Sequence, residues 1–383
     1  MKVVFISGML PVGHYSQSIT SGLANNPGIE LIVYADKDPK NLEIQGCGEI
    51  KLVWSKSLSY VYEILRQVLA DKPDLIHLQH ELNMYGGLIT AMFFPLLLLM
   101  LKIMGFKTVV TVHAAVYKKQ IDHELIRIFH QNPKYVKPFM VSLAFHYIYK
   151  SISLLSGRQI VHTELTRKII STDYGVDAKR VKVIPIAIPQ KRLRNLPKEH
   201  YFFYFGYMAR RKGLGYLLDG FQKYLTANPH SDFRLILAGG IIKGQEEAFD
   251  EIKNQIEGTA MKGKVEMKGF INMEQQDDLY EKAYAVCNPA ILSMGSSGPL
   301  FHAASYGKCV IATKIGHFIE DLDHLKTGYL IENDKWHDAF KYIAENPEVV
   351  KQIEQATLKK AKERSPENTA RIYLEWYREA IGK

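Results

Sequence analysis

The chain has few cysteines and no long apolar run, and each shortage excludes a class of protein. Its three cysteines, Cys47, Cys287 and Cys309, share no metal-binding spacing and cannot all pair, so we expect buried, reduced side chains and a reducing compartment. The longest apolar run, residues 88–101, holds about 14 residues and contains Pro95, whereas a membrane span needs roughly 20. We expect a buried helix there, with contact at a membrane surface as the alternative.

Size and composition indicate an ordinary globular protein with two domains. The 383 residues are 47% hydrophobic and 23% charged, which is typical of folded rather than disordered chains. A chain of this length is long enough for two domains with a core each. The first residues, MKVVFISG, are typical of a strand and not of a signal peptide, since the apolar region is too short. We therefore expect a cytoplasmic location.

The net charge of +9 is unevenly distributed. Through Pro189 there are 21 basic and 14 acidic residues (+7), and the remainder has 28 and 26 (+2). Residues 102–150 hold eight basic and two acidic residues, interleaved with aromatic side chains. This pattern fits an anionic membrane surface or a phosphate-bearing substrate, and equally a solvated helix face with ordinary core aromatics. No nucleic-acid recognition motif accompanies it, so we expect no nucleic-acid partner.

The order of apolar runs predicts two α/β domains. In the first half, five short apolar runs alternate with helical patterns, which indicates a parallel sheet covered on both faces. These runs are VVFIS, LIVYA, DLIHLQ, TVVTVHA and QIVHT. The stretch VKVIPIAIPQKRLRNLP, with three prolines, is interpreted as a linker. A second alternating series begins at YFFYFGYM, so we expect domains at residues 1–187 and 190–365, with a ligand between the carboxyl ends of their sheets.

A glycine- and serine-rich loop in the second half is the first candidate site. The stretch NPAILSMGSSGPLFHAASYGKCVIAT predicts strand, loop, helix and strand. Backbone N–H groups of Ser296, Ser297 and Gly298 at a helix N-terminus would form an anion site. The first strand–loop–helix connection, SGMLPVGHYSQS, contains Gly8 and Gly13, which would also allow close approach of a ligand.

Strand ends supply the other candidates. His113 ends TVVTVH and should face the space between the domains, although a structural histidine at a strand end is the alternative. His77, His80 and Glu81 in HLQHE lack the helical spacing of a zinc site, so no metal is expected.

A basic cluster follows the first strand of the second half. Arg210, Arg211 and Lys212 in FGYMARRKG suit a diphosphate, with a solvated turn as the alternative. Gly240, in LAGG, belongs to another loop of close approach.

Taken in order, these segments resemble a retaining family-4 glycosyltransferase of the GT-B fold. The resemblance spans nearly the whole chain and rests on the order and spacing of loose motifs. These are LPVGH, PDLIHLQH, TVVTVH, KVIPIAI, GYMARRKG, LAGG and YGKCVIAT. It also implies that the aromatic final helix, residues 366–383, crosses back onto the first domain.

The resemblance implies roles for matching positions. His113 would contact the donor sugar near the reacting centre, and Lys212 would bind the donor diphosphate. Gly13 and the loop at Ser296, Ser297 and Gly298 would offer backbone contacts to phosphate. The acceptor side would fall on the first domain, near His14, Glu81, Lys118 and Lys119. No cofactor and no metal are implied beyond the nucleotide-sugar donor.

The chain departs from the family pattern at three positions. The family arginine before the lysine falls on Tyr207, and Arg210 or Arg211 is the expected substitute. The family's paired glutamates fall on Met294 and His302. A histidine can still hydrogen-bond a ribose, but a methionine cannot replace a carboxylate. Compensation is expected from Glu320 or His317.

The resemblance implies transfer of a sugar, most simply a hexose, from a nucleoside diphosphate to a hydroxyl acceptor with retained anomeric configuration. The basic, aromatic segment after His113 lies in the first domain, which is the acceptor side in the family, so we expect a glycan or a lipid-linked or phosphate-bearing acceptor and peripheral contact with an anionic membrane. Two alternatives remain: a non-catalytic nucleotide-sugar-binding protein, suggested by the missing glutamates, and another GT-B enzyme such as a nucleotide-sugar epimerase.

Overall fold

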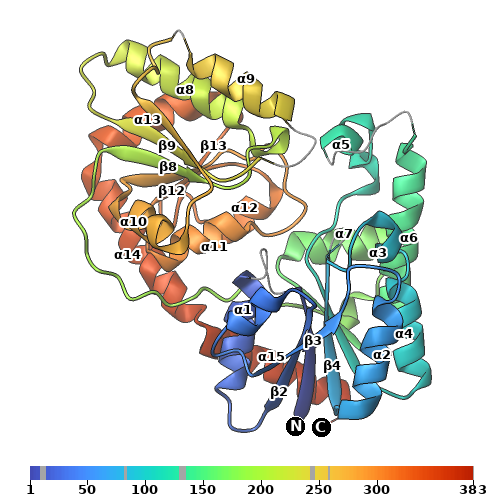
Figure 1. The fold of residues 1–383 in the computed structure, drawn as a ribbon. Coiled ribbons are helices and arrows are strands. Elements are labelled where there is room, and N and C mark those ends of the chain that lie inside the picture. The colour runs from blue at the N-terminus through green and yellow to red at the C-terminus, as the bar shows by residue number, and fades with distance from the viewer. Residues whose placement is uncertain (9–13, 82–83, 129–134, 242–245, 258, 383) are drawn as a thin grey trace.

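The protein, seen in a computed structural model, consists of two α/β lobes (Figure 1). The structure describes residues 1–8, 14–81, 84–128, 135–241, 246–257 and 259–382. Each lobe contains one parallel sheet with helices on both faces, as the alternating apolar runs predict. The expected GT-B architecture of two Rossmann-like domains is therefore confirmed.

The first sheet has seven parallel strands in the order β3-β2-β1-β4-β5-β6-β7. Val4 of β1 pairs with Ile32 of β2 on one side and with Ile76 of β4 on the other. The strands are β1 (Lys2–Ile6), β2 (Glu30–Asp36), β3 (Glu49–Trp54), β4 (Leu75–His80), β5 (Thr108–Val112), β6 (Arg158–Val161) and β7 (Val181–Val183). The helices are α1 (His14–Ala24), α2 (Tyr60–Asp71), α3 (Leu88–Ala91), α4 (Phe94–Ile103), α5 (His123–Ile128), α6 (Pro138–Leu155) and α7 (Glu164–Tyr174), with 3-10 turns η1 (Pro39–Glu43), η2 (Lys118–Gln120) and η3 (Ala178–Arg180).

The second sheet has six parallel strands in the order β10-β9-β8-β11-β12-β13. They are β8 (Tyr201–Phe205), β9 (Arg234–Ala238), β10 (Val265–Gly269), β11 (Ala285–Asn288), β12 (Val310–Thr313) and β13 (Tyr329–Ile331). The helices are α8 (Leu214–Ala227), α9 (Glu246–Ile256), α10 (Met273–Lys282), α11 (Gly298–Ser305), α12 (Gly316–Asp321), α13 (Trp336–Glu345), α14 (Pro347–Glu363) and α15 (Pro366–Ile381), with 3-10 turns η4 (Arg210–Lys212) and η5 (Asn333–Lys335).

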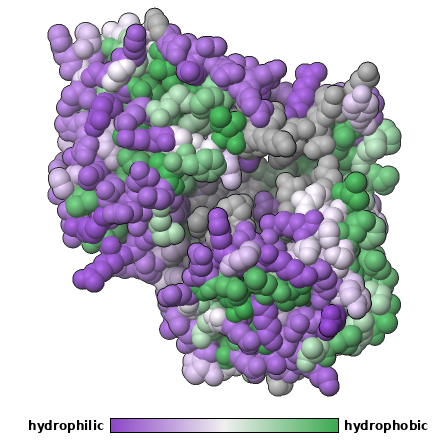
Figure 2. All heavy atoms as spheres, in the orientation of Figure 1, coloured by the Kyte–Doolittle hydropathy of each residue, from purple (hydrophilic) through white to green (hydrophobic). Residues whose placement is uncertain are grey.

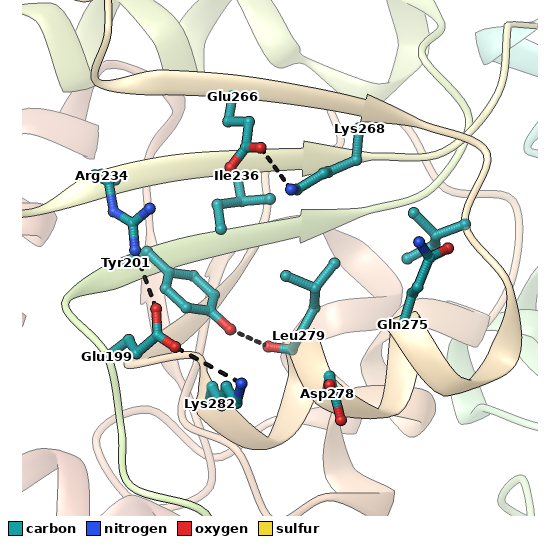
Figure 3. Close-up of a pocket in the computed structure, with 11 residues that line it drawn as sticks. Glu199, Tyr201, Arg234, Ile236, Glu266, Lys268, Gln275, Asp278, Leu279 and Lys282 are labelled. Carbon is teal, nitrogen blue, oxygen red and sulfur yellow. Dashed lines mark hydrogen bonds and ion pairs between the residues drawn. The ribbon is translucent and has the colours of Figure 1, made fainter.

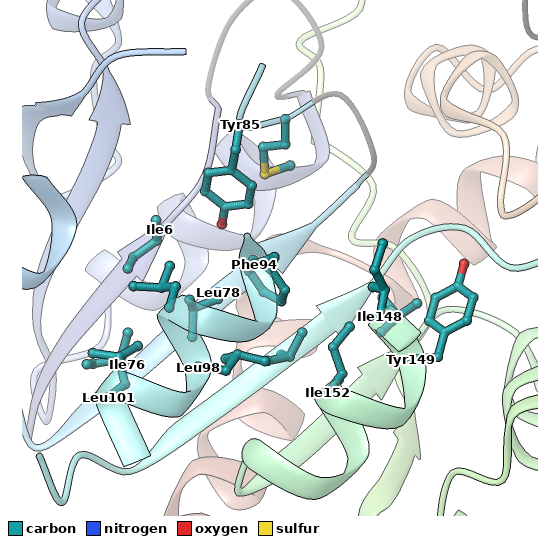
Figure 4. Close-up of a cluster of buried hydrophobic side chains, with 14 of the residues drawn as sticks. Ile6, Ile76, Leu78, Tyr85, Phe94, Leu98, Leu101, Ile148, Tyr149 and Ile152 are labelled. Atoms are coloured by element: carbon teal, nitrogen blue, oxygen red, sulfur yellow. The ribbon is translucent and has the colours of Figure 1, made fainter. Parts of the chain in front are cut away.

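Two cores lie on opposite faces of the first sheet. One is formed with α2, α4, α6 and α7, and it includes Phe94, Leu98 and Ile152 (Figure 4). The other is formed with α1 and α15, and Tyr377 from α15 is fully buried in it. The last helix therefore packs on the first lobe although the second sheet precedes it in the chain (Figure 1).

Three segments differ from the sequence expectation. The strand β3 is present although no strand was expected there, because EIKLVW alternates at the sheet edge instead of forming a continuous apolar run. The apolar stretch 88–101 is divided into α3 and α4. The stretch interpreted as a linker begins with β7, so only the residues after Val183 connect the sheets. Within the described ranges, none of the helices combines the length and apolar character needed to cross a membrane.

Candidate functional site

A hollow lies between the two lobes (Figure 2), and the strands of both sheets run toward it (Figure 1). The strand order reverses between β1 and β4 in the first sheet, and between β8 and β11 in the second. In open parallel sheets, ligands bind outside the carboxyl ends of the strands at this point of reversal. The loops that follow these strands therefore define the candidate site.

His113, directly after β5, is half-buried and lies in a row with two buried side chains, Gln79 of β4 and His162 after β6. Its Nε2 is 2.5 Å from Oε1 of Gln79, and its Nδ1 is 3.2 Å from Nε2 of His162. The Nδ1 of His162 lies 2.8 Å from the carbonyl oxygen of Ile184. A carbonyl only accepts, so His162 donates from Nδ1 and accepts at Nε2. His113 therefore donates from its own Nδ1.

The amide of Gln79 determines which proton state of His113 matches its neighbours. With the amide oxygen toward His113, the ring carries protons on both nitrogens; with the amide turned over, its NH2 donates to a neutral ring. In this second orientation, the oxygen of the Gln79 amide lies 3.0 Å from Nε2 of His77. Nδ1 of His77 then accepts from the hydroxyl of Tyr377 at 2.5 Å. Burial and the neighbouring His162 lower the pKa of His113 well below its usual value, so we assign the neutral state.

Tyr15 and Glu81 lie beside this histidine row. The rings of Tyr15 and His113 are 4.2 Å apart between centroids, and the Tyr15 hydroxyl donates to Glu81 over 3.4 Å. Burial raises the pKa of the Glu81 carboxyl, while the Tyr15 hydroxyl and the charge of Arg211 oppose this rise. Arg211 belongs to the second lobe, so a carboxyl group and a guanidinium face each other across the hollow.

The turn η4 after β8 places two cations at the carboxyl end of the second sheet. Gly213 ends the turn in the left-handed conformation (φ 67°), and a Cβ atom there would lie 2.0 Å from the carbonyl oxygen of Pro289. This close approach joins the β8 and β11 loops. Burial and the charge of Arg211 lower the pKa of Lys212 to about 7. Arg210 instead points to α9, where it pairs with Glu251 at 2.8 Å.

No ion pair is recorded within the described residues for Arg211 or Lys212. Burial also lowers the pKa of the Arg211 guanidinium, with Tyr204 and Glu81 opposing it. Two adjacent cations without an anionic partner at hydrogen-bond distance are costly to bury. An anion bound between them would remove that cost.

The loop before α11 forms the adjacent wall. Ser297 is the N-cap residue of α11, and its hydroxyl accepts from Asn288 at 3.0 Å. A Cβ atom at Gly298 would meet nothing within 4 Å, so this helix start is open. The hydroxyl of Ser296 is buried close to the Asp321 carboxyl. The geometry matches the expected anion-binding helix start.

Residues 294 and 295 join the two lobes. The amide of Ala115 donates to the carbonyl oxygen of Met294 at 2.7 Å, and the Met294 side chain packs against the core of the first lobe. A Cβ atom at Gly295 would lie 2.0 Å from the carbonyl oxygen of His113. Only glycine allows this close approach between the α11 loop and the β5 loop.

A second contact between the lobes involves α12 and the start of α7. The carboxylate of Glu320 accepts from the backbone N–H groups of Glu164 and Leu165 at 2.7 and 2.6 Å. Nδ1 of His317 lies 3.0 Å from the hydroxyl of Thr163, the N-cap of α7. Both side chains expected to compensate for Met294 are therefore engaged in holding α7.

His302, on the second turn of α11, faces α10. Its Nε2 is hydrogen-bonded to the side-chain amide of Gln276, and its ring packs against Phe205 and Tyr280. Gly240, at the end of β9, lies against the ring of Phe270.

The acceptor-side residues of the sequence prediction are spread along the first lobe. Lys118 and Lys119 are exposed in η2; the amine of Lys118 lies 3.4 Å from Nδ1 of His146 and over the Tyr174 ring. They border α6 and α7 rather than the histidine row. His14 is the first residue of α1, and Gly13 lies outside the described residues.

Other features of the surface do not form a competing site. A shallow groove on the second sheet lies near the starts of β8 and β9, the opposite end from the carboxyl edge (Figure 3). Its charges pair with one another, as in Arg234–Glu199 and Lys268–Glu266. Across the described ranges, no cluster of three or more His, Cys, Asp or Glu side chains is arranged to hold a metal ion.

Sequence reasoning did not identify Tyr15, Gln79 or His162 as site residues. Gln79 and His162 do stand at the ends of apolar runs, in HLQH and QIVHT. The strand order β4-β5-β6 follows the chain, so adjacent strand ends were the available signal.

Comparison with known proteins identifies the family. A model of "Glycosyltransferase Family 4" matches residues 12–192, and a model of "Glycosyl transferases group 1" matches residues 188–360. The mannosylfructose-phosphate synthase of Agrobacterium fabrum is 23% identical over 223 residues, which are 50% of this chain and 44% of that protein's length. The chain thus matches less than half of this curated relative.

Solved structures with the same architecture cover nearly the whole chain. The Anabaena protein HepE, in complex with UDP and glucose, has a TM-score of 0.75 at 15% identity, covering 98% of each chain. Sucrose-phosphate synthase from Thermosynechococcus elongatus has a TM-score of 0.73 at 14% identity, covering 100% of this chain and 99% of that one. At such identities these likenesses show the fold. The two family models lie end to end along the sequence, and the protein therefore belongs to the glycosyltransferases of the GT-B fold, with a Family 4 region followed by a group 1 region.

Proposed function

We propose that this glycosyltransferase moves a hexosyl group from a nucleoside-diphosphate hexose to a hydroxyl acceptor with retention of anomeric configuration. The observation that carries the proposal is the meeting of two kinds of loop in the hollow. Arg211, Lys212 and the start of α11 offer positive charge on one side, and His113 with Glu81 stands on the other. A diphosphate joined to a sugar requires both kinds of contact.

The diphosphate would bind to the second lobe. Lys212 and Arg211 supply charge, and backbone N–H groups near Ser296, Ser297 and Gly298 supply hydrogen bonds at the positive end of α11. The side chain of Arg210 pairs with Glu251 of α9. Arg211 is therefore the guanidinium nearer the hollow. No metal is required, because these groups stabilise the charge that develops on the leaving diphosphate.

His113 would act as a neutral hydrogen-bonding group near the anomeric carbon. Both of its nitrogens are hydrogen-bonded within the protein, so a sugar hydroxyl must displace the Gln79 amide to reach Nε2. His162 fixes the proton on Nδ1 and thereby leaves Nε2 as an acceptor. We assign Gln79 and His162 as positioning residues for His113.

The resemblance implies carboxylates at positions 294 and 302, where this chain has Met294 and His302. Neither of these side chains would take over the role of a carboxylate. Met294 packs on the first lobe and offers its carbonyl to Ala115, so this segment joins the lobes instead of holding sugar hydroxyls. His302 bonds Gln276 and would reach a ribose only after exchanging that partner. Glu320 holds the start of α7. Donor-sugar contacts then come mainly from the first lobe, through His113.

The reaction balances without an enzyme nucleophile. The bond between the anomeric carbon and the diphosphate oxygen breaks, and a bond from that carbon to the acceptor oxygen forms on the same face. The proton of the acceptor hydroxyl ends on the leaving diphosphate. The protein contributes charge stabilisation and positioning of the two reactants.

We assign residues 1–187 with the final helix 366–383 to the acceptor domain and residues 190–365 to the donor domain. The acceptor would approach past Glu81 and His14, with Lys118 and Lys119 available to a phosphate group farther out. UDP-glucose is the first donor to test, since HepE is solved in complex with it. A phosphate-bearing sugar is the first soluble acceptor, by analogy with the named products of the two synthases.

A donor panel tests the proposal. The purified protein is screened for thermal stabilisation by nucleoside-diphosphate hexoses, and the donors that raise Tm are assayed for nucleotide release with candidate acceptors. The anomeric coupling in the NMR spectrum of the product reports its configuration. Inversion would refute the retaining assignment. Donor binding without turnover on any acceptor would favour a binding protein, and epimerised donor without acceptor would favour an epimerase.

A further inference from the structure

The first lobe carries an exposed apolar face on α4 and α6. Of the 24 exposed large apolar side chains among the described residues, 12 lie within residues 89–154. α4 and α6 pack side by side, so their outward rows form one surface, which Figure 2 shows as hydrophobic colour along the outer edge of this lobe. The rows are Leu96, Leu99 and Ile103 on α4, and Phe139, Leu143 and Tyr147 on α6.

The spacing of these residues shows that each helix presents one apolar row to solvent. The α4 residues are three and four positions apart and those of α6 are four apart, so each set lies on one side of its helix. Phe139 is 70% exposed, Leu143 66% and Ile103 70%. Soluble proteins rarely leave a contiguous surface of this kind without a partner.

The same segment has a large excess of basic over acidic residues. Residues 82–163 contain nine Lys and Arg and two acidic residues, a net of +7 out of +9 for the whole chain. Neither α4 nor α6 contains an acidic residue, whereas Lys102 and Lys150 lie on them and Lys107 is exposed after α4. An apolar surface framed by lysines is complementary to a layer of acyl chains under anionic headgroups.

We propose that the α4/α6 face docks on an anionic lipid bilayer. The apolar rows would enter the boundary between headgroups and acyl chains, and the lysines would lie at the level of the lipid phosphates. A second copy of the chain fits less well, because neither α4 nor α6 has an acidic residue to pair with the lysines of another copy, and the lysines of two such faces would repel one another. The contact with the bilayer is made by helices and does not depend on loops, since both apolar rows lie on packed helices.

The face is continuous in sequence with the candidate site. From His113 the chain passes through η2 and α5 to α6, and Lys118 reaches His146 on α6 at 3.4 Å. The lysines of η2 thus lie beside α6, between His113 and α6 in the chain. In this one respect the inference rests on the proposed function: the acceptor would be a bilayer-anchored molecule with a phosphate near its reacting hydroxyl.

Vesicle binding of the full-length protein tests the docking face. Phosphatidylcholine vesicles with about 30% phosphatidylglycerol are compared with pure phosphatidylcholine at low and moderate salt. The double variant Phe139→Glu with Leu143→Glu should lower the bound fraction at least about tenfold, because two apolar side chains leave the contact and two like charges face the lipid. Both positions are exposed, so the fold should persist. Met273→Glu, at a residue 68% exposed on α10 of the other lobe, is the matched control.

A second pair of variants separates charge from apolar contact. Lys102→Gln with Lys107→Gln should weaken binding about tenfold at low salt and much less at high salt, while Lys341→Gln with Lys351→Gln on the second lobe should not change it. UDP-glucose stabilisation is measured on every variant. It should stay at the wild-type value, so loss of vesicle binding is distinguishable from failure of the donor site.

Three outcomes would overturn the inference. They are no binding to the anionic vesicles at low salt, wild-type binding by the Phe139→Glu, Leu143→Glu variant, and a concentration-dependent dimer in sedimentation that this variant abolishes. If the vesicles bind as expected but no nucleotide sugar does, the docking face stands and the proposed function fails.

Discussion

Binding of the donor should draw a proton onto Lys212. Burial and the adjacent Arg211 lower the pKa of this amine to about 7 in the free protein, so about one-tenth of the molecules carry its proton at pH 8. A diphosphate next to the amine favours the charged form and returns the pKa toward its usual value. Binding at pH 8 should therefore take up about 0.9 proton, and binding at pH 7 about 0.5.

The same linkage sets the pH dependence of affinity. The protonated fraction of Lys212 falls from about one-half at pH 7 to about one-hundredth at pH 9, so Kd should rise by up to about fiftyfold between these values. The sign follows from the lowered pKa: the binding-competent amine is the protonated one, which is depleted as pH rises. UDP-glucose is the appropriate ligand, since its diphosphate diester does not titrate in this range, whereas a terminal phosphate has a second pKa near about 6.

Isothermal titration calorimetry in two buffers with different ionisation enthalpies measures the proton uptake directly. Lys212→Arg should retain binding and lose the uptake, because a guanidinium is always charged. Lys212→Met should weaken binding and also lose the uptake, while Lys341→Met, on α13, should leave both unchanged. Binding by the wild type at pH 8 without proton uptake, or uptake that survives in Lys212→Met, would refute the placement of the diphosphate at Lys212.

Three further predictions concern the histidine row and the contact between the lobes. His162→Phe should lower kcat about tenfold or more with less than about a twofold change in donor Kd, since it removes the acceptor that fixes His113; equal losses in both quantities would contradict a positioning role. Gly295→Ala should destabilise the protein by about 1–3 kcal/mol in urea titrations, because its Cβ atom would lie 2.0 Å from the His113 carbonyl oxygen, and an unchanged midpoint would contradict this contact. The free energy of unfolding should fall as pH drops from about 6.5 to 4, by about 1 kcal/mol per buried histidine per pH unit. Burial lowers the pKa of His80 and His317 to about 4 in the folded protein, so the unfolded chain binds protons at a higher pH than the folded one does. A urea midpoint that stays constant over this pH range would exclude the linkage.

The sequence predicted the fold well because its strands are continuous apolar runs separated by clear helical patterns. The edge strand β3 was missed because its first half carries Glu49 and Lys51 and is only partly buried, so it does not form a continuous apolar run. The division of 88–101 into α3 and α4 depends on how Phe94 and Leu97 fill the core, which is a property of packing and not of local composition.

The candidate site was only partly accessible from the sequence. His113 and Lys212 stand at strand ends and match family motifs, so their neighbourhood could be predicted. Arg210 points away from the hollow because it is the first residue of the 3-10 turn η4 and because glutamates of α9, about forty positions later in the chain, pair with it. The packing of Met294 on the other lobe involves residues from two domains, and no pattern within one segment records it.

The last helix has a consequence for how the chain is made. The ring of His77 bonds Tyr377 of α15, and the indole of Trp376 donates to the carbonyl oxygen of Gln159 at 3.1 Å, so residues near the end complete the core of the first lobe. Because α15 follows the strands of both sheets in the chain, the ribosome releases these residues only after it has released both sheets. The second lobe has its whole sheet available earlier, so the part translated first is the part that acquires its final form last. A chain interrupted before α15 would leave one face of the first sheet covered by α1 alone and prone to aggregation, however complete its second lobe.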